Sequence, residues 1–418
     1  MDWEEFKEKV KKLLFLYRRW DEIEYLDEEI IIKTAKNKIV YTKNQYNELL
    51  KEINTYEYND YTLKGADSYE ALLWEPMNNN NSFYLIKDLG TLNDVKNQIT
   101  YEVNVISDIM FYYIIKNMDV AAYTISIKSH EFISYIYTSD SVLSFFKSII
   151  GLPRSVYVCF ENQISKLELK SLIDSYLFDI ARNYNIILNV TNNEEDVLGR
   201  KAITYTSNKI TPLRDAPNKI YNQALLEKYR LAMISKDPMM KFIEFYHIIE
   251  YFFNIVFFED SYNKLRNIIN KEDFSYNNNN DLLEIIEFVR KKFKGSMRVP
   301  EGEALLLTLK KRVDIDELKV RLEFISSPKI ENYKLKEVSF SKGNEVDLDS
   351  KNEDDIYKNL RDRIYKTRNA IVHNKLNEDN EDNNLIYNPF EHEEELRKEI
   401  PLMRAIAEQI IIKTAEEI

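Results

Sequence analysis

Residues Glu353 to His373 read "EDDIYKNLRDRIYKTRNAIVH", and this stretch decides which fold the second half of the chain can adopt. Its apolar residues recur every three or four positions, which is the period of an α-helix with one buried face. The predicted buried face consists of Ile356, Leu360, Ile364, Thr367 and Ile371. The acidic, Asn-rich sequence that follows cannot continue such a face, so we expect the helix to end at His373.

The surrounding segments have the same helical period. Helices are predicted over "NQALLEKYRLAMIS" (222–235), Met239 to Phe258, "NDLLEIIEFVRKKFKG" (280–295), and "EELRKEI" plus "LMRAIAEQIIIKTA" with an interruption at Pro401. The second of these helices begins at an Asp cap, Asp237, followed by Pro238 at the first helical position. The order predicts an all-α, antiparallel bundle over residues 219–418, with a less regular insertion near 295–350.

The first half of the chain has a different pattern. Its β-branched runs are "EEIIIKTA" (28–35), "KIVYT" (38–42), "ITYEVNVI" (99–106), "AAYTISIK" (121–128), "SVYVCF" (155–160) and "NIILNVT" (185–191). The last two flank a helical pattern, so we expect a strand–helix–strand unit there. Residues 1–206 are therefore predicted to form a mixed α/β domain, followed by a proline-containing linker at 207–218. The chain as a whole is predicted to be an α+β protein.

Composition excludes several classes of protein. A hydrophobic fraction of 44% and an aromatic fraction of 13% predict a folded chain, and a net charge of -12 disfavours non-specific binding to polyanions. The single cysteine, Cys159, permits no disulfide and is expected to be buried. The glycines form neither a GxxxxGK nor a GxGxxG motif. With no signal-peptide pattern at the N-terminus and no uninterrupted apolar span, we expect a cytoplasmic protein without membrane contact.

The candidate catalytic residues are Arg368, Asn369 and His373. Asn369 and His373 are four positions apart and share one helix face, and the long Arg368 side chain can reach the same place. At a helix C-terminus the dipole favours the imidazolium, which raises the pKa of His373 toward that of a working proton donor. The chain has only four histidines, and no other has an Arg at this spacing.

The stretch Arg368-Asn369-Ala370-Ile371-Val372-His373 resembles the Arg, polar residue, then His motif of HEPN ribonucleases, on the late helix of a helical bundle. Its surroundings are most similar to the Apea-like HEPN group of bacterial anti-phage and abortive-infection proteins. The resemblance covers the chain from about Lys219 onward. It implies a metal-independent endoribonuclease that needs no cofactor, in which two bundles dimerise and place both motifs in one composite site.

Two further groups of residues bear on this prediction. Glu244, His247 and Glu250 form a polar stripe on an otherwise apolar helix, where they either support the Arg-Asn-His helix or form a structural or partly solvated polar face. Glu244 and His247 have the spacing of di-iron bundles, but no second such pair exists, so no metal is predicted. The best candidate contacts to RNA phosphates are Arg290, Lys291, Lys292, Lys294 and Arg298, and the alternative is that they form an ordinary solvated helix end.

Two alternatives stay open at the level of the sequence. The helical half can instead be a non-catalytic dimerisation or interaction module for a protein or nucleic-acid partner. The first domain can respond to a small nucleotide or to a phage-derived protein, and nothing in its residues decides between these triggers.

Overall fold

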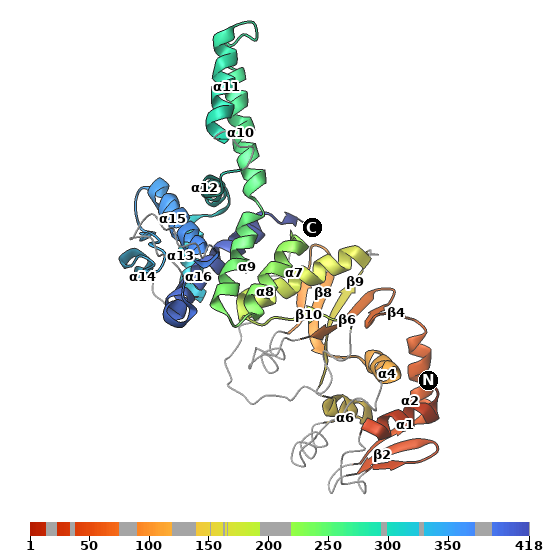
Figure 1. Cartoon of the computed structure of the whole chain (residues 1–418). Helices are drawn as coiled ribbons and strands as arrows, with labels where there is room; N and C mark the ends of the chain where they lie inside the picture. The colour runs from red at the N-terminus through yellow and green to blue at the C-terminus, as the bar shows by residue number, and fades with distance from the viewer. Residues whose placement is uncertain are drawn as a thin grey trace. The chain divides into compact units, whose positions relative to one another are not determined.

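The computed structural model divides into two compact units, Met1–Ile220 with Glu417–Ile418, and Tyr221–Glu416 (Figure 1). The described residues are 1–13, 23–33, 38–74, 90–118, 139–150, 152–161, 164, 166–192, 219–293, 299–325, 330–372 and 387–417. The first unit is a sheet region and the second is helical, so the chain is a mixed α and β protein, as predicted. The predicted linker at 207–218 and the strand at 121–128 lie outside the described residues.

The first unit contains a seven-stranded antiparallel sheet and a three-stranded one. The large sheet has the order β4-β5-β6-β9-β8-β7, with β10 also paired to β6. Its strands are β4 (Glu57–Asn59), β5 (Thr62–Lys64), β6 (Ser68–Trp74), β7 (Leu92–Asp94), β8 (Ile99–Val105), β9 (Arg154–Phe160) and β10 (Asn189–Val190). The small sheet consists of β1 (Ile23–Tyr25), β2 (Glu29–Lys33) and β3 (Lys38–Thr42).

Helices cover both faces of the large sheet. Helix α7 (Lys166–Tyr184) packs on the face that carries Ala71, Val156 and Val158. The opposite core, which includes Leu72, is built from α1 (Trp3–Leu13), α2 (Lys43–Ile53), α4 (Asp108–Asn117) and α6 (Val142–Ile149) together with β2 and β3. Successive residues of a strand point to opposite faces, which explains this division.

The strand–helix–strand unit predicted from the sequence is β9–α7–β10. Both strands pair antiparallel with β6 and therefore run parallel to each other, with β6 between them. Cys159, which lies in β9, is exposed, and this corrects the prediction that it is buried. The alternation along β9 turns it away from the face that α7 covers, between buried Val158 and Phe160.

The described part of the second unit is predominantly helical. Its helices are α8 (Gln223–Ile234), α9 (Pro238–Glu250), α10 (Phe253–Ile269), α11 (Asn279–Phe293), α12 (Glu301–Arg312), α13 (Ile315–Ile325), α14 (Glu331–Leu335), α15 (Glu353–Val372) and α16 (Pro389–Lys413). Two short strands, β11 (Lys219–Ile220) and β12 (Glu416–Glu417), lie next to its two chain ends. No helix within the described ranges is long and apolar enough to cross a bilayer.

Three predictions about these helices are wrong. The helix predicted over Met239–Phe258 is two helices, because α9 ends at Glu250 and α10 begins at Phe253. The interruption predicted at Pro401 does not occur. Helix α16 continues past Pro401, which lacks the backbone N–H that would donate a helical hydrogen bond. Residues 295–350 are not an irregular insertion, because they contain α12, α13 and α14, and Leu305 and Leu309 of α12 are fully buried.

A buried polar cluster holds the centre of this unit. The carboxylate of Glu408 on α16 is 1% exposed and accepts hydrogen bonds from Tyr229 Oη (2.6 Å), Arg404 Nε (2.7 Å) and Arg321 Nε. Burial alone raises the pKa of a carboxyl group, but the two guanidinium groups outweigh it and hold the pKa of Glu408 below its usual value. The cluster therefore fixes α8, α13 and α16 relative to one another.

Candidate functional site

The candidate site lies at the end of α15, where Arg368 and Asn369 occupy the last turn. Thr367 and Ala370 point into the core of the bundle, whereas Arg368 and Asn369 are half-buried. His373 follows Val372 in the sequence and lies outside the described residues. The described part of the site consists of Arg368, Asn369 and the groups that hold them.

The Arg368 guanidinium has partners from three helices. Its Nη1 donates to Oδ1 of the adjacent Asn369 at 3.1 Å, and its Nη2 lies 3.3 Å from Oε1 of Glu301 at the start of α12. Its central carbon lies 5.5 Å from the centroid of the Tyr246 ring on α9, within cation–π range. The Arg368 side chain is 16% exposed, so most of it is enclosed by its neighbours.

Tyr246 of α9 is the third residue that contacts Arg368 or Glu301 at this site. Its hydroxyl donates a 2.6 Å hydrogen bond to the same Oε1 of Glu301 that faces Arg368. Burial, followed by the bond to Glu301 and the charge of Glu301, raises the pKa of Tyr246 well above its usual value. The phenol therefore stays protonated and acts as a fixed donor. Glu301 thus connects α9, α12 and α15 at one point.

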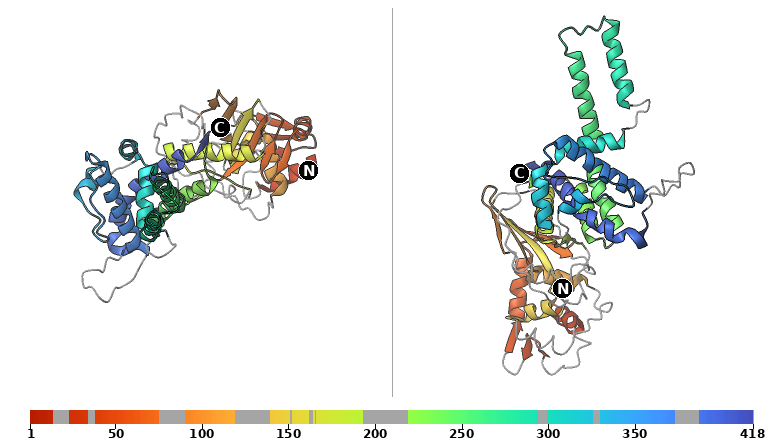
Figure 2. Two further views of the ribbon diagram at one scale, coloured as in Figure 1. Left: turned by 90° about the horizontal axis from the view of Figure 1, so that it is seen from above. Right: turned by 90° about the vertical axis from the view of Figure 1, so that its left-hand side faces the viewer.

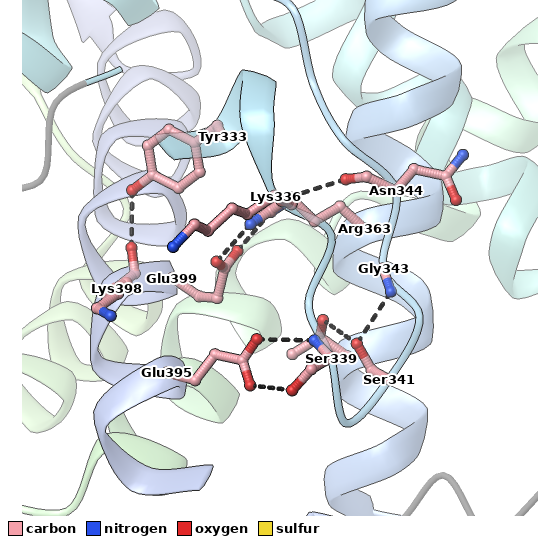
Figure 3. Close-up of polar contacts among 11 residues, drawn as sticks. Tyr333, Lys336, Ser339, Ser341, Gly343, Asn344, Arg363, Glu395, Lys398 and Glu399 are labelled. Atoms are coloured by element: carbon pink, nitrogen blue, oxygen red, sulfur yellow. Dashed lines mark hydrogen bonds and ion pairs between the residues drawn. The ribbon is translucent and has the colours of Figure 1, made fainter. Parts of the chain in front are cut away.

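A buried ion pair anchors α15 five residues before Arg368. Arg363 donates from Nε and Nη2 to the two carboxylate oxygens of Glu399 on α16, both at 2.7 Å (Figure 3). Its Nη1 donates to the backbone carbonyls of Lys336 (2.9 Å) and Asn344 (2.8 Å). The guanidinium also lies 5.3 Å from the Tyr333 ring centroid. One side chain therefore holds α16 and both ends of the loop that runs from Lys336 to Asn344.

That loop packs directly on the turn of α15 before Arg368. The hydroxyls of Ser341 and Thr367 are 3.0 Å apart and hydrogen-bonded, and Lys366 Nζ donates to the Lys342 carbonyl at 3.0 Å. Glycine suits the close approach here, since a Cβ at position 343 would lie 3.1 Å from the Arg363 carbonyl oxygen, a tight contact. Figure 3 shows the opposite side of the loop, where the Ser339 N–H and hydroxyl donate to Glu395. The end of α15 is therefore held on a rigid support.

The polar stripe of α9 is placed differently from the expectation. Glu244 is 6% exposed and its carboxylate lies 3.3 Å from Lys228 Nζ on α8 and 3.5 Å from His247 Nδ1. Glu244 therefore faces α8 and not α15, because it is about 200° around α9 from Tyr246. Glu250 is one turn after Tyr246 and lies on the same side of α9 as that residue.

The described residues of the predicted basic patch differ in burial, so they do not form one exposed surface. Lys292 is buried and paired with Asp260 (2.7 Å) and Glu303 (2.5 Å), with the Phe257 ring centroid 4.5 Å from its Nζ. It therefore holds α10, α11 and α12 together and is not available to RNA phosphates, which corrects the expectation. Arg290 and Lys291 are exposed. Lys294 and Arg298 lie outside the described residues.

The first unit has a pocket of about 670 Å³ beside its large sheet. Its walls come from the β4–β5 turn, β6, α7 and β10, and its lining includes Tyr69, Lys170 and Asp174. Within the described residues of the two units, no three His, Cys, Asp or Glu side chains are grouped closely enough to hold a metal ion.

Sequence reasoning missed Glu301 and Tyr246. Glu301 follows Pro300 and begins a pattern with Ala304, Leu305 and Leu309 on one face, which is the usual signal of a helix start. That signal was present in a segment interpreted as an irregular insertion. Tyr246 lies in an apolar run, where no feature of the sequence distinguishes it from a core aromatic residue.

Comparison of the chain with protein-family models, with curated proteins and with solved structures found no match.

Proposed function

We propose that the chain is a metal-independent endoribonuclease of the HEPN type, in which Arg368, Asn369 and His373 act on the scissile phosphate. One observation carries the proposal. The Arg368 guanidinium and the Asn369 amide are hydrogen-bonded to each other at the end of α15, five and four residues before the histidine of the motif. A cation and an amide held together on a fixed helix end suit a phosphodiester, whose oxygens accept hydrogen bonds.

The proposed chemistry is transesterification followed by release of the 5′-hydroxyl product. The 2′-hydroxyl of the RNA attacks phosphorus while it loses its proton to a base, and the 5′-oxygen leaves as it gains a proton from an acid. Arg368 stabilises the charge that develops on the non-bridging oxygens, and His373 transfers a proton. Asn369 orients the imidazole. The products carry a 2′,3′-cyclic phosphate and a 5′-hydroxyl, and no step requires a metal.

A second copy of the chain supplies the second imidazole. Each chain provides one motif with one histidine, whereas the reaction needs both an acid and a base. Two motifs brought together in a homodimer satisfy this requirement. In this proposal the RNA substrate binds at a composite site formed by both second units.

The biological setting proposed for this activity is anti-phage defence by abortive infection. An RNA-cutting protein that is active at all times damages its own cell, so a controlling element is required. The first unit is proposed to supply it, and its pocket of about 670 Å³ is large enough for a small nucleotide. A phage-derived protein is the alternative trigger.

A non-catalytic interaction module is the second candidate function. The exposed apolar side chains of α10 and α11 favour it, because such surfaces bind other proteins. The two candidates differ in a direct assay. In the nuclease, a labelled RNA is cut in EDTA to products ending in a 2′,3′-cyclic phosphate, and an RNA with 2′-deoxy residues is left intact. In the module, neither RNA is cut by the pure protein or after addition of infected-cell extract.

A further inference from the structure

Two half-buried side chains, Arg361 and Tyr365, share the face of α15 that carries Arg368. The three residues are spaced by four and then three positions, so at 100° per residue they fall within about 60° of one another. The helix rises about 1.5 Å per residue, which places the tyrosine between the two arginines. This face of α15 therefore has two cationic side chains with an aromatic side chain between them.

Contacts with the first turn of α12 place Arg361 beside the candidate site. A Cβ added to Gly302 would lie 3.7 Å from Arg361 Nη1 and 4.0 Å from Cε1 of the Tyr365 ring. The preceding residue, Glu301, is the one whose carboxylate lies 3.3 Å from Arg368 Nη2. The two guanidinium groups therefore face consecutive residues of α12, and the tyrosine ring lies next to them.

The guanidinium of Arg361 is less engaged than those of the other arginines on this helix. Arg363 donates to both carboxylate oxygens of Glu399 and to two carbonyl groups. Within the ranges that the structure describes, the ion-pair partner of Arg361 is the adjacent Asp362 at 2.8 Å, and the Arg361 Nε makes no hydrogen bond. The Arg361 side chain is 29% exposed, against 16% for Arg368. A guanidinium has five N–H donors, so Arg361 has donors available to a ligand.

Tyr365 provides a ring surface next to this cation. It is half-buried, whereas Tyr246, the other tyrosine near Arg368, is 1% exposed and donates its hydroxyl to Glu301. Bases of single-stranded RNA stack on aromatic side chains, and RNA phosphates accept hydrogen bonds from arginine. An arginine and a tyrosine one helical turn apart therefore match the phosphate and the base of one nucleotide.

We propose that Arg361 and Tyr365 bind the nucleotide next to the scissile phosphate, with Arg361 on its phosphate and Tyr365 stacked on its base. The inference rests on the proposed function, because Arg368 marks the position of the scissile phosphate. Seven residues rise about 10.5 Å along the helix, so the two guanidinium groups are placed for different phosphates of one strand. The RNA then follows α15 away from the motif, and these two side chains determine its affinity.

The first test is the affinity of the full chain for a labelled single-stranded RNA that is 2′-O-methylated throughout, so that it lacks the attacking hydroxyl. Fluorescence anisotropy measures its Kd. Arg361→Gln and Tyr365→Ala are each expected to weaken binding about tenfold. An unchanged Kd in either variant contradicts the proposal.

The matched control for this test is Arg266→Gln. Arg266 is an exposed arginine of α10, in the hairpin of α10 and α11 that extends away from the other helices of the second unit (Figures 1 and 2). Its Kd is expected to equal that of wild type. Weakening by Arg266→Gln equal to that by Arg361→Gln means that only overall charge matters, which refutes a contact specific to α15.

Salt dependence and conservative variants identify each contact. Loss of one phosphate contact on a single strand reduces the slope of log K against log salt concentration by about 0.7. Arg361→Gln is expected to show this reduction, and Arg361→Lys to keep the wild-type slope. Tyr365→Phe is expected to restore the affinity lost in Tyr365→Ala, because stacking needs the ring and not the hydroxyl. An unchanged slope in Arg361→Gln, or no rescue by Tyr365→Phe, shows that the side chain is only structural.

Cleavage kinetics separate this inference from the proposed nuclease. On an unmodified RNA in EDTA, Arg361→Gln and Tyr365→Ala are expected to raise KM more than they lower kcat, whereas Arg368→Ala loses kcat. Circular dichroism confirms that each variant is folded. If wild type cuts RNA and both α15 variants keep its KM, the inference fails and the nuclease stands. If wild type shows the binding effects above without any cleavage, the nuclease fails and the binding face stands. A wild type that does not bind RNA refutes both.

Discussion

The guanidinium of Arg368 and the carboxylate of Glu301 lie 3.3 Å apart, and this pair joins the end of α15 to the beginning of α12. Glu301 also accepts the hydrogen bond of Tyr246, so one carboxylate positions the cation that the proposed reaction uses. Groups of this kind act by fixing the orientation of a neighbour, and their loss lowers rate more than binding.

Glu301→Gln is therefore expected to lower kcat for RNA cleavage about tenfold with little change in KM, because the charge that orients Arg368 is lost while the bond from Tyr246 is kept. Tyr246→Phe, which keeps the ring under the guanidinium, is expected to lower kcat less. Steady-state kinetics on a short fluorescent RNA measures both parameters. An unchanged kcat in Glu301→Gln shows that the pair is only structural.

A second prediction concerns the buried pair of Arg363 and Glu399. Arg363→Met is expected to lower the free energy of unfolding by about 3–5 kcal/mol, because it leaves Glu399 buried without its partner. The double variant Arg363→Met with Glu399→Leu is expected to recover a large part of this loss. Urea unfolding followed by circular dichroism gives both values.

The control for this pair is Arg397→Ala, which removes a 46% exposed partner of Glu393 and is expected to cost less than about 1 kcal/mol. Equal losses in Arg363→Met and Arg397→Ala mean that the buried pair does not anchor the loop from Lys336 to Asn344.

Local signals in the sequence predicted part of this fold. Asp237 and Pro238 mark the start of α9 through chemistry that depends only on neighbouring residues, and Asp237 indeed caps the Met239 N–H at 2.9 Å. The end of the same helix has no comparable signal, because Tyr251 and Phe252 are apolar and only tertiary packing turns the chain there. Pro401 shows the reverse case, in which the surrounding bundle overrides a residue that usually ends a helix.

Only those residues of the candidate site that lie close together in the sequence could be predicted from it. Arg368 and Asn369 stand in one motif, so the sequence names them directly. Glu301 is 67 positions earlier than Arg368, and its approach depends on how α12 packs on α15. Burial of Lys292 depends likewise on Asp260 and Glu303, which come from two other helices. Long-range partners of this kind leave no periodic signal.

A third prediction concerns pH and Asp179 on α7. Burial raises the pKa of this carboxyl to about 7, with Arg182 opposing the shift. The folded state therefore binds more protons than the unfolded state between about pH 4 and 7. It follows that the free energy of unfolding decreases as the pH rises through this window.

Asp179→Asn removes that dependence, since the amide does not ionise. The variant is expected to be more stable than wild type by about 1–3 kcal/mol at pH 8 and equal to it at pH 4. Denaturation at several pH values measures the difference, with exposed Glu161→Gln as the control. A stability difference that is constant between pH 4 and 8 excludes titration of Asp179 as its cause.

A fourth prediction separates the residues of the motif. Asn369→Ala is expected to reduce cleavage less than His373→Ala, because an orienting amide transfers no proton. Removing a proton-transfer group costs about 10² to 10⁴ in rate. Single-turnover cleavage of both variants at saturating protein measures the ratio. Equal rates in the two variants contradict the assigned roles.

The most direct test of the central claim is the cleavage of a labelled RNA in EDTA by wild type, Arg368→Ala and His373→Ala, with folding checked by circular dichroism. Lys358→Ala, a 53% exposed change on the same helix, is the control. The account predicts that wild type and Lys358→Ala cut the RNA to 2′,3′-cyclic phosphate ends, while Arg368→Ala and His373→Ala stay folded and lose at least about 10² in rate. Cleavage by the two motif variants at the wild-type rate would contradict it.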